Sequence, residues 1–191
     1  MRVTRLLIAA LLLVGACTGS ATKKSTPNDF VDAACADLSG FATSVDRAVK
    51  DLQSLSQIDV TDTVGTQAFL VRLSTSLREA DTATTQLANG ISSRGAPNIA
   101  SGDDIKKAIL DSLNRLREGL GKTRNAIDAF DFKTATTDES AKLRAEIDSL
   151  TTTGAEAIAG LAPLNENNEL RAAFAGSATC RQVGSQLSSG P

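Results

Sequence analysis

The sequence contains no His, no Trp and no Tyr among its 191 residues, so six Phe supply all of its aromatic side chains. Without His, the chain lacks the most versatile general base and the commonest metal ligand of proteins. The net charge of -2 disfavours nucleic acid as a partner, because the phosphate backbone attracts basic surfaces. We therefore expect neither a His-dependent enzyme nor a nucleic-acid-binding protein, and we expect no cofactor and no metal.

The composition is nevertheless that of a folded chain. Hydrophobic residues make up 41% of the sequence and charged residues 22%, which is enough apolar material for a core and too much for wholesale disorder. The length suits a single domain of ordinary size.

The first residues have the pattern of an export signal. Arg2 and Arg5 form a positive region, and residues 6–14 form an apolar run that is too short to span a bilayer of about 30 Å hydrocarbon. The small residues Gly15 and Ala16 follow, and then Cys17.

The run Val14-Gly15-Ala16-Cys17 resembles the lipobox of bacterial lipoproteins. The resemblance implies that residues 1–16 are removed as a signal peptide and that Cys17 carries the lipid, a diacylglyceryl group with fatty chains such as palmitate. The protein would then be extracytoplasmic and anchored to the bacterial cell membrane through that lipid, since two or more acyl chains anchor stably. An ordinary signal peptide with an incidental Cys is the alternative.

Residues 17–27 are predicted to form the lipidated Cys and a flexible tether, because residues 18–27 have almost no apolar content. Lys23 and Lys24 could contact anionic lipid head groups, or they could simply keep the tether soluble. The remaining residues, 28–190, are predicted to form one helical domain.

Apolar residues repeat with helical period over most of this domain. The first segment has a two-sided seam, with Val31, Leu38 and Val45 seven residues apart on one side and Ala34, Phe41 and Ala48 on the other. Helices are expected at about 28–56, 62–92 and 102–131, followed by a fourth that opens at Thr136 and ends or kinks at Pro163. Their expected N-caps are Asn28 or Asp29, Asp62, the run Ser101–Asp104, and a capping box of Thr136 and Glu139.

These features predict an all-α fold, since alternating strand-like runs of useful length are absent. Short connections favour antiparallel neighbours. We therefore expect an up-down-up-down bundle of four long helices, with a final helix or kinked extension after Pro163.

Two cysteines remain if Cys17 carries lipid. Cys35 and Cys180 lie near the two ends of the domain, and both fall on the apolar seams of their segments. An exported protein enters a compartment in which disulfides persist. We predict a Cys35–Cys180 disulfide, the alternative being two buried free thiols.

Two motifs suggest chemistry but fit packing better. The run Gly119-Leu120-Gly121-Lys122-Thr123 matches the end of a phosphate-binding loop, yet the required first glycine is Leu116 and the run keeps the helical seam. We predict no nucleotide site there, but two small residues that let a neighbouring helix approach. The acid pairs Asp103/Asp104 and Asp138/Glu139 lie at expected helix N-termini, where carboxylates stabilise the helix dipole.

Gly154, Gly160 and Pro163 interrupt the apolar stripe of the fourth helix. These residues either let helices pack closely or leave a groove for an apolar ligand, and they are the candidate ligand-binding residues. The loop at 93–102 is a candidate contact surface, because loops often carry function.

The overall layout resembles the small helical lipoproteins and secreted proteins of actinobacteria, in its lipobox, polar tether, Ala/Thr/Leu-rich helices and one Cys near each end. That family mostly lacks an assigned activity, so the resemblance implies location rather than mechanism. We expect a non-enzymatic, membrane-anchored interaction module that binds an envelope protein through its helix faces or the 93–102 loop. The alternatives are a carrier of an apolar ligand such as a lipid, and an enzyme of unfamiliar type.

Overall fold

The computed structural model describes residues 23–54, 63–131, 134–160 and 162–182. The helices are α1 (Pro27–Ser54), α2 (Thr63–Ser92), α3 (Gly102–Asp128), α4 (Thr137–Ala159), α5 (Pro163–Glu166) and α6 (Asn168–Gly176). Residues 178–182 are helical again. No strand occurs in these ranges, apart from an isolated bridge between Ser25 and Pro97. The all-α prediction is confirmed, and the helix bounds agree with the expected ones to within a few residues.

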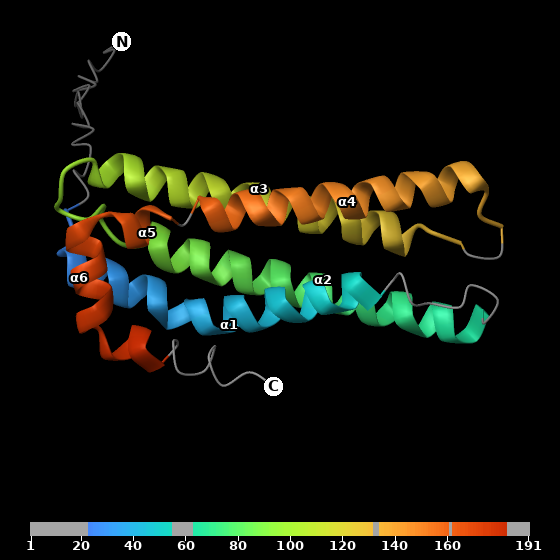
Figure 1. Cartoon of the computed structure of the whole chain (residues 1–191), viewed down its shortest axis with the longest axis horizontal. Helices are drawn as coiled ribbons and strands as arrows, with labels where there is room; N and C mark the ends of the chain where they lie inside the picture. Colours follow the sequence, from blue (N-terminus) through green and yellow to red (C-terminus); the bar gives the residue numbers. More distant parts are fainter. Residues whose placement is uncertain (1–22, 55–62, 132–133, 161, 183–191) are drawn as a thin grey trace, which may run out of the picture.

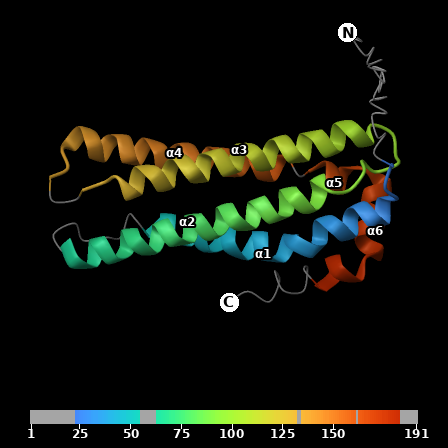
Figure 2. The same cartoon turned by 180° about the vertical axis from the view of Figure 1, so that it is seen from behind.

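The four long helices run alternately up and down (Figure 1). α1 packs on α2, α2 on α3, and α3 on α4. The short helices α5 and α6 lie at the end of the bundle where α1 begins, and α6 packs against α1. Figure 2 shows the same arrangement from behind, with the α2–α3 connection at that same end. The predicted up-down bundle with an extension after Pro163 is therefore confirmed.

The core follows the predicted apolar seams. Phe30 and Val31 of α1, Leu73 and Leu77 of α2, and Leu113 of α3 are completely buried. Alanines are frequent in this core and let the helices approach closely. Thr84 and Thr123 are also buried, and the Thr84 hydroxyl donates to the carbonyl of Ala80 one turn earlier, which satisfies it within its own helix.

Helix starts follow the sequence with two corrections. The capping box at α4 is confirmed, since the Thr136 N–H donates to Glu139 Oε2 at 2.7 Å and the Glu139 N–H to Thr136 Oγ1 at 3.3 Å. At α1 the cap is Thr26 rather than Asn28 or Asp29, because its hydroxyl accepts from the Asp29 N–H and Pro27 takes the first helical position.

The second correction concerns the start of α3. Ser101 makes no side-chain cap and instead adopts a left-handed backbone conformation with φ 58°. The sequence pattern of Ser, Gly and two acids predicted a capping serine. The left-handed turn directs the backbone into the helix without that hydrogen bond. Asp62, the predicted cap of α2, lies outside the described residues.

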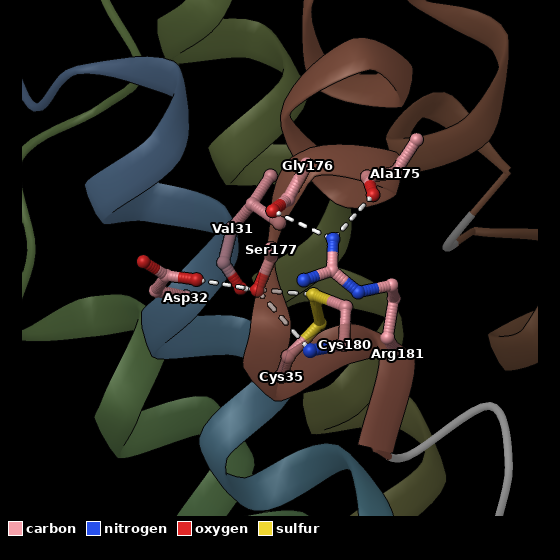
Figure 3. The surroundings of a disulfide bond; sticks show 8 residues. All are labelled: Val31, Asp32, Cys35, Ala175, Gly176, Ser177, Cys180 and Arg181. Atoms are coloured by element: carbon pink, nitrogen blue, oxygen red, sulfur yellow. Dashed lines mark hydrogen bonds between the residues drawn. A yellow bond between two sulfur atoms is a disulfide. The ribbon is translucent and has the colours of Figure 1, made fainter.

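The predicted Cys35–Cys180 disulfide is present, with both residues buried and an S–S distance of 2.01 Å. It joins α1 to the short helical segment 178–182 that follows α6 (Figure 3). Ser177 reinforces the junction, because its hydroxyl donates to Asp32 on α1 and accepts from the Cys180 N–H. The disulfide and the Ser177–Asp32 hydrogen bond therefore both attach the C-terminal segment to α1.

Residues 23–26 differ from the predicted flexible tether. The Ser25 N–H donates to the Ala96 carbonyl at 2.9 Å, and the Asn98 N–H donates to the Ser25 carbonyl at 2.8 Å. Lys24 forms an ion pair with Asp103 at the start of α3. We call residues 23–26 the N-terminal strap, because they lie along the α2–α3 connection and hold it to α1.

Candidate functional site

A hollow with mostly apolar walls lies between α1 and α4. The backbones of these two helices make almost no contact, whereas the pairs α1–α2, α2–α3 and α3–α4 all pack closely. Between them lies a groove with a volume of about 410 Å³, which we call the α1–α4 groove. Its lining residues are Val45, Ala48, Val49, Leu52, Gln53, Leu77, Leu116, Leu120, Ile147, Asp148, Leu150, Thr151, Gly154 and Ala155.

The groove has an apolar floor and a mixed rim. Leu77, Leu116 and Leu120 are almost fully buried and form the floor from α2 and α3. At the rim Val49 remains 42% exposed, an unusually open position for a residue on an apolar seam. The groove therefore leaves aliphatic surface accessible that a closed bundle would bury.

Its few polar groups lie at the edge. Gln53, Asp148 and Thr151 are exposed, and the Thr151 hydroxyl donates to the Ile147 carbonyl of its own helix. Asp148 is the single charged side chain among the described residues that line the groove. Apolar walls with a few polar groups at the edge are typical of small-molecule sites.

The three predicted ligand-binding residues separate in the structure. Gly154 lines the groove, and a Cβ built on it would meet no atom within 4 Å. Gly160 serves close packing instead, because a Cβ there would overlap the Ser112 hydroxyl of α3. Pro163 begins α5. Of the two interpretations of this segment, the groove applies at Gly154 and close packing at Gly160.

The glycine-containing run and the acid pairs that the sequence analysis singled out all lie within helices. The Gly119–Thr123 run lies inside α3, and Gly119 faces α4, where a Cβ would lie 3.2 Å from Leu150 Cδ1. Asp103 and Asp104 occupy the first turn of α3. Hydrogen bonds from the backbone and hydroxyl of Thr136 hold the pKa of Glu139 below its ordinary value. Among the residues described, no group of three or more Cys, Asp or Glu is placed to hold a metal.

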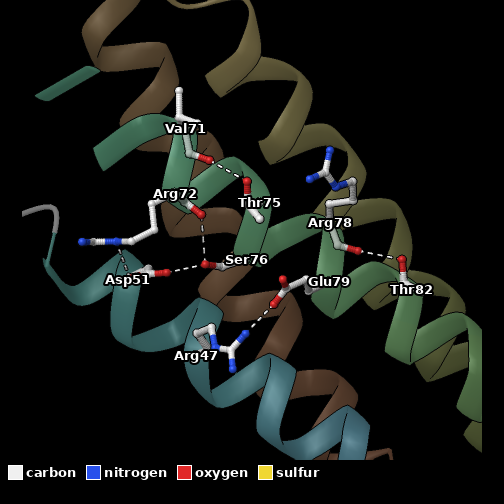
Figure 4. Close-up of polar contacts among 9 residues, drawn as sticks. All are labelled: Arg47, Asp51, Val71, Arg72, Thr75, Ser76, Arg78, Glu79 and Thr82. Carbon is white, nitrogen blue, oxygen red and sulfur yellow. Dashed lines mark hydrogen bonds and ion pairs between the residues drawn. The ribbon is translucent and has the colours of Figure 1, made fainter. Parts of the chain in front are cut away.

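A polar cluster joins the outer surfaces of α1 and α2 (Figure 4). Arg47 pairs with Glu79 at 2.6 Å, and Arg72 pairs with Asp51 at 3.2 Å while Ser76 donates to the same carboxylate. All four charged side chains already have partners across the helix pair. We infer that this cluster fixes the register between α1 and α2. Exposed ion pairs of this kind each contribute about 1 kcal/mol or less to stability.

The 93–102 loop is less available than the sequence predicted. Ala96 and Pro97 are buried, and the N-terminal strap covers their backbone. Lys106 further binds the loop by donating to the carbonyls of Ser92 and Arg94. Its backbone is therefore largely occupied by contacts within the protein.

Sequence reasoning identified several groove residues but assigned them to the core. Val45 lies on the predicted seam of α1, and Leu52 continues that seam seven residues later. The two-sided seam of α1 was the available signal, since one side packs on α2 and the other needs a second partner. Asp148 could not be recognised as a groove residue from the sequence, because isolated acidic residues are common on exposed helix positions. Cys17, the predicted lipidation residue, lies outside the described residues.

Comparisons with protein-family models, with curated proteins and with solved structures gave no match. Within the described residues, no helix is both long enough and apolar enough to cross a membrane.

Proposed function

We propose that this chain is a non-enzymatic binding protein of the bacterial cell envelope, held at the membrane by a lipid on Cys17, and that it binds an apolar ligand in the α1–α4 groove. The observation that carries the proposal is the groove itself. It is lined by aliphatic side chains from all four long helices, and it separates α1 from α4, the pair of helices whose contact would close the bundle.

The size and lining of the groove favour a small ligand. Its volume of about 410 Å³ falls toward the lower end of the ~300–1,000 Å³ typical of small-molecule sites. Burial of apolar surface contributes ~25 cal/mol per Å², so a hydrocarbon chain along the groove gains affinity by covering the accessible surface of Val49 and of the half-buried Val45 and Leu52, without any specific polar contact.

The proposed lipid anchor is supported by the sequence pattern of residues 1–17. The short distance in sequence between Cys17 and the bundle is compatible with it. Six residue steps separate Cys17 from Lys23, the first described residue, and six steps span at most about 20 Å. A lipid on Cys17 would therefore hold the strap end of the bundle close to a membrane surface.

The proposal is tested by filling the groove. Gly154→Leu places an aliphatic side chain in open space, and it improves helix propensity by about 0.5–1 kcal/mol. We expect Nile red, an uncharged apolar dye, to bind the wild-type domain and to lose about tenfold in affinity in this variant, while the melting temperature does not fall. Fluorescence titration and thermal unfolding measure the two quantities.

Gly40→Leu is the matched control, because Gly40 is an exposed residue inside α1, away from the groove, and a Cβ there also meets no atom within 4 Å. It should bind the dye as the wild type does. Dye binding that is absent in the wild type, or unchanged in Gly154→Leu, would contradict the proposed function.

An envelope protein as partner is the second candidate. Val64 and Val71 lie seven residues apart on α2 and are 78% and 63% exposed, so this helix presents apolar surface outside the groove. Native mass spectrometry of the full-length protein extracted from its own membrane distinguishes the candidates. Extra mass that dissociates as a small apolar molecule favours the groove ligand, whereas a second polypeptide favours a protein partner.

A further inference from the structure

We propose that the ligand of the α1–α4 groove is an amphiphile with a single apolar chain and a head group that donates hydrogen bonds and carries no negative charge, and that Asp148 selects this head. The inference rests on the proposed function and names the chemical class of the ligand. It is carried by the charge at the groove rim together with the groove's volume.

Asp148 has the right position for this role. It lies on α4 between Ile147 and Leu150, which both line the groove, and it is exposed at the rim. A ligand whose hydrocarbon chain covers the apolar floor would place its polar head at the rim, beside the Asp148 carboxylate. An ionised carboxylate accepts hydrogen bonds and donates none.

Two cations that neighbour groove residues in the sequence are already paired, and Arg144, one turn before Asp148 on α4, lies outside the groove lining. Lys50, next to the lining residue Val49, pairs with Asp46 at 2.8 Å. Arg117, next to Leu116 on α3, lies against Asp81 of α2 at 3.6 Å. Neither belongs to the groove lining. A carboxylate or phosphate head would therefore meet the negative charge of Asp148 without a cation in the lining to offset it.

The expected discrimination is moderate, because the rim is exposed to water. Two unit charges about 6 Å apart near a protein surface interact strongly enough to change affinity by about threefold to tenfold. A hydroxyl or ammonium head escapes the repulsion, and an ammonium gains an attraction of similar size. The order of affinity should be ammonium, then hydroxyl, then carboxylate.

The single chain follows from the space available. The groove is about 410 Å³ and is bounded by Leu52 and Ile147 on facing helices. Ala48 and Gly154 leave room between them for one chain lying along the helices. A two-chain lipid would need a larger cavity, toward the upper end of the range known for ligand sites.

The test uses three probes with the same chain: dodecylammonium, dodecanol and dodecanoate, each displacing Nile red from the wild-type protein near pH 7 at low salt. We expect dodecanoate to bind about threefold to tenfold more weakly than dodecanol. Asp148→Asn should remove this difference, and Asp148→Lys should reverse it. High salt should reduce the difference in the wild type, because rim charges are screened.

Glu156→Gln is the matched control, since it removes one negative charge from the same helix outside the groove lining. It should leave the order of affinity unchanged. If no probe displaces the dye, the proposed function fails. If all three bind equally to the wild type, or if Asp148→Asn keeps the order, the groove still binds apolar chains but Asp148 does not select the head, and the present inference fails alone.

Discussion

At the scale of single residues, three glycines on the α3–α4 side of the bundle have three different surroundings. A Cβ at Gly119 would press tightly against Leu150, Gly154 opens onto the groove, and Gly160 leaves no room for a Cβ beside Ser112. The same missing side chain therefore has a different consequence at each position, which depends on the facing helix.

Gly160→Ala should destabilise the protein by about 1–3 kcal/mol, because the new methyl group overlaps the buried Ser112 side chain and one of the two helices must shift. Urea unfolding measures the change. Gly154→Ala is the control and should be neutral or more stable by up to about 1 kcal/mol. Equal unfolding midpoints for the two variants would show that α3 and α4 are not packed as closely as described.

The sequence could identify Gly154, Gly160 and Pro163 as interruptions of an apolar stripe, but it could not separate their roles. Periodicity shows which face of a helix is apolar. It does not show which residue of a neighbouring helix lies opposite a given glycine, because that depends on the register between two elements distant in sequence.

At the scale of elements, α6 is attached to α1 and α5 rather than to the centre of the bundle. Its own caps are regular, with Asn167 accepting from the N–H groups of Glu169 and Leu170. The Cys35–Cys180 bond closes a loop across a sequence separation of 145 residues. The chain-entropy description assigns the largest stabilisation to long loops of this kind.

Replacing both cysteines, as Cys35→Ala with Cys180→Ala, should lower the free energy of unfolding by up to about 5 kcal/mol. The double variant avoids an unpaired thiol. Chemical denaturation measures the loss, with the reduced wild-type protein as a second route to the same state. An unchanged midpoint in both would mean that the disulfide does not restrict the unfolded chain.

Helices were the most predictable elements, because their seams, turn residues and caps agreed with one another. The start of α3 was the least predictable, since the Ser101 cap expected from its residue type is replaced by a left-handed turn. The disulfide was predictable because Cys35 and Cys180 both lay on seams near the two ends of the domain, once Cys17 was assigned to the expected lipid anchor.

At the scale of the whole molecule, the N-terminal strap joins α1 to the α2–α3 connection through two backbone hydrogen bonds around Ser25. This attachment could not be predicted from the sequence, because residues 23–26 lack an apolar seam. The open side between α1 and α4 was unpredictable for a related reason: an apolar stripe does not reveal which of its neighbours will cover it.

Ser25→Pro should loosen the α2–α3 connection, because proline has no N–H to donate to the Ala96 carbonyl. Loss of that hydrogen bond should lower protection of the Asn98 amide by about threefold to tenfold in hydrogen exchange. Ser25→Ala keeps the backbone donor and should leave protection unchanged. Equal protection in the two variants would mean that the strap does not hold the loop.

The order of helix contacts also bears on how the chain reaches this structure. Each long helix packs mainly on the one before it and the one after it, and the contact between α1 and α6 is the major exception. Interactions between neighbours in sequence close short loops, which favours rapid folding. The four long helices can therefore assemble in the order in which they are synthesised, and joining the two ends of the domain is the step that must wait for the complete chain.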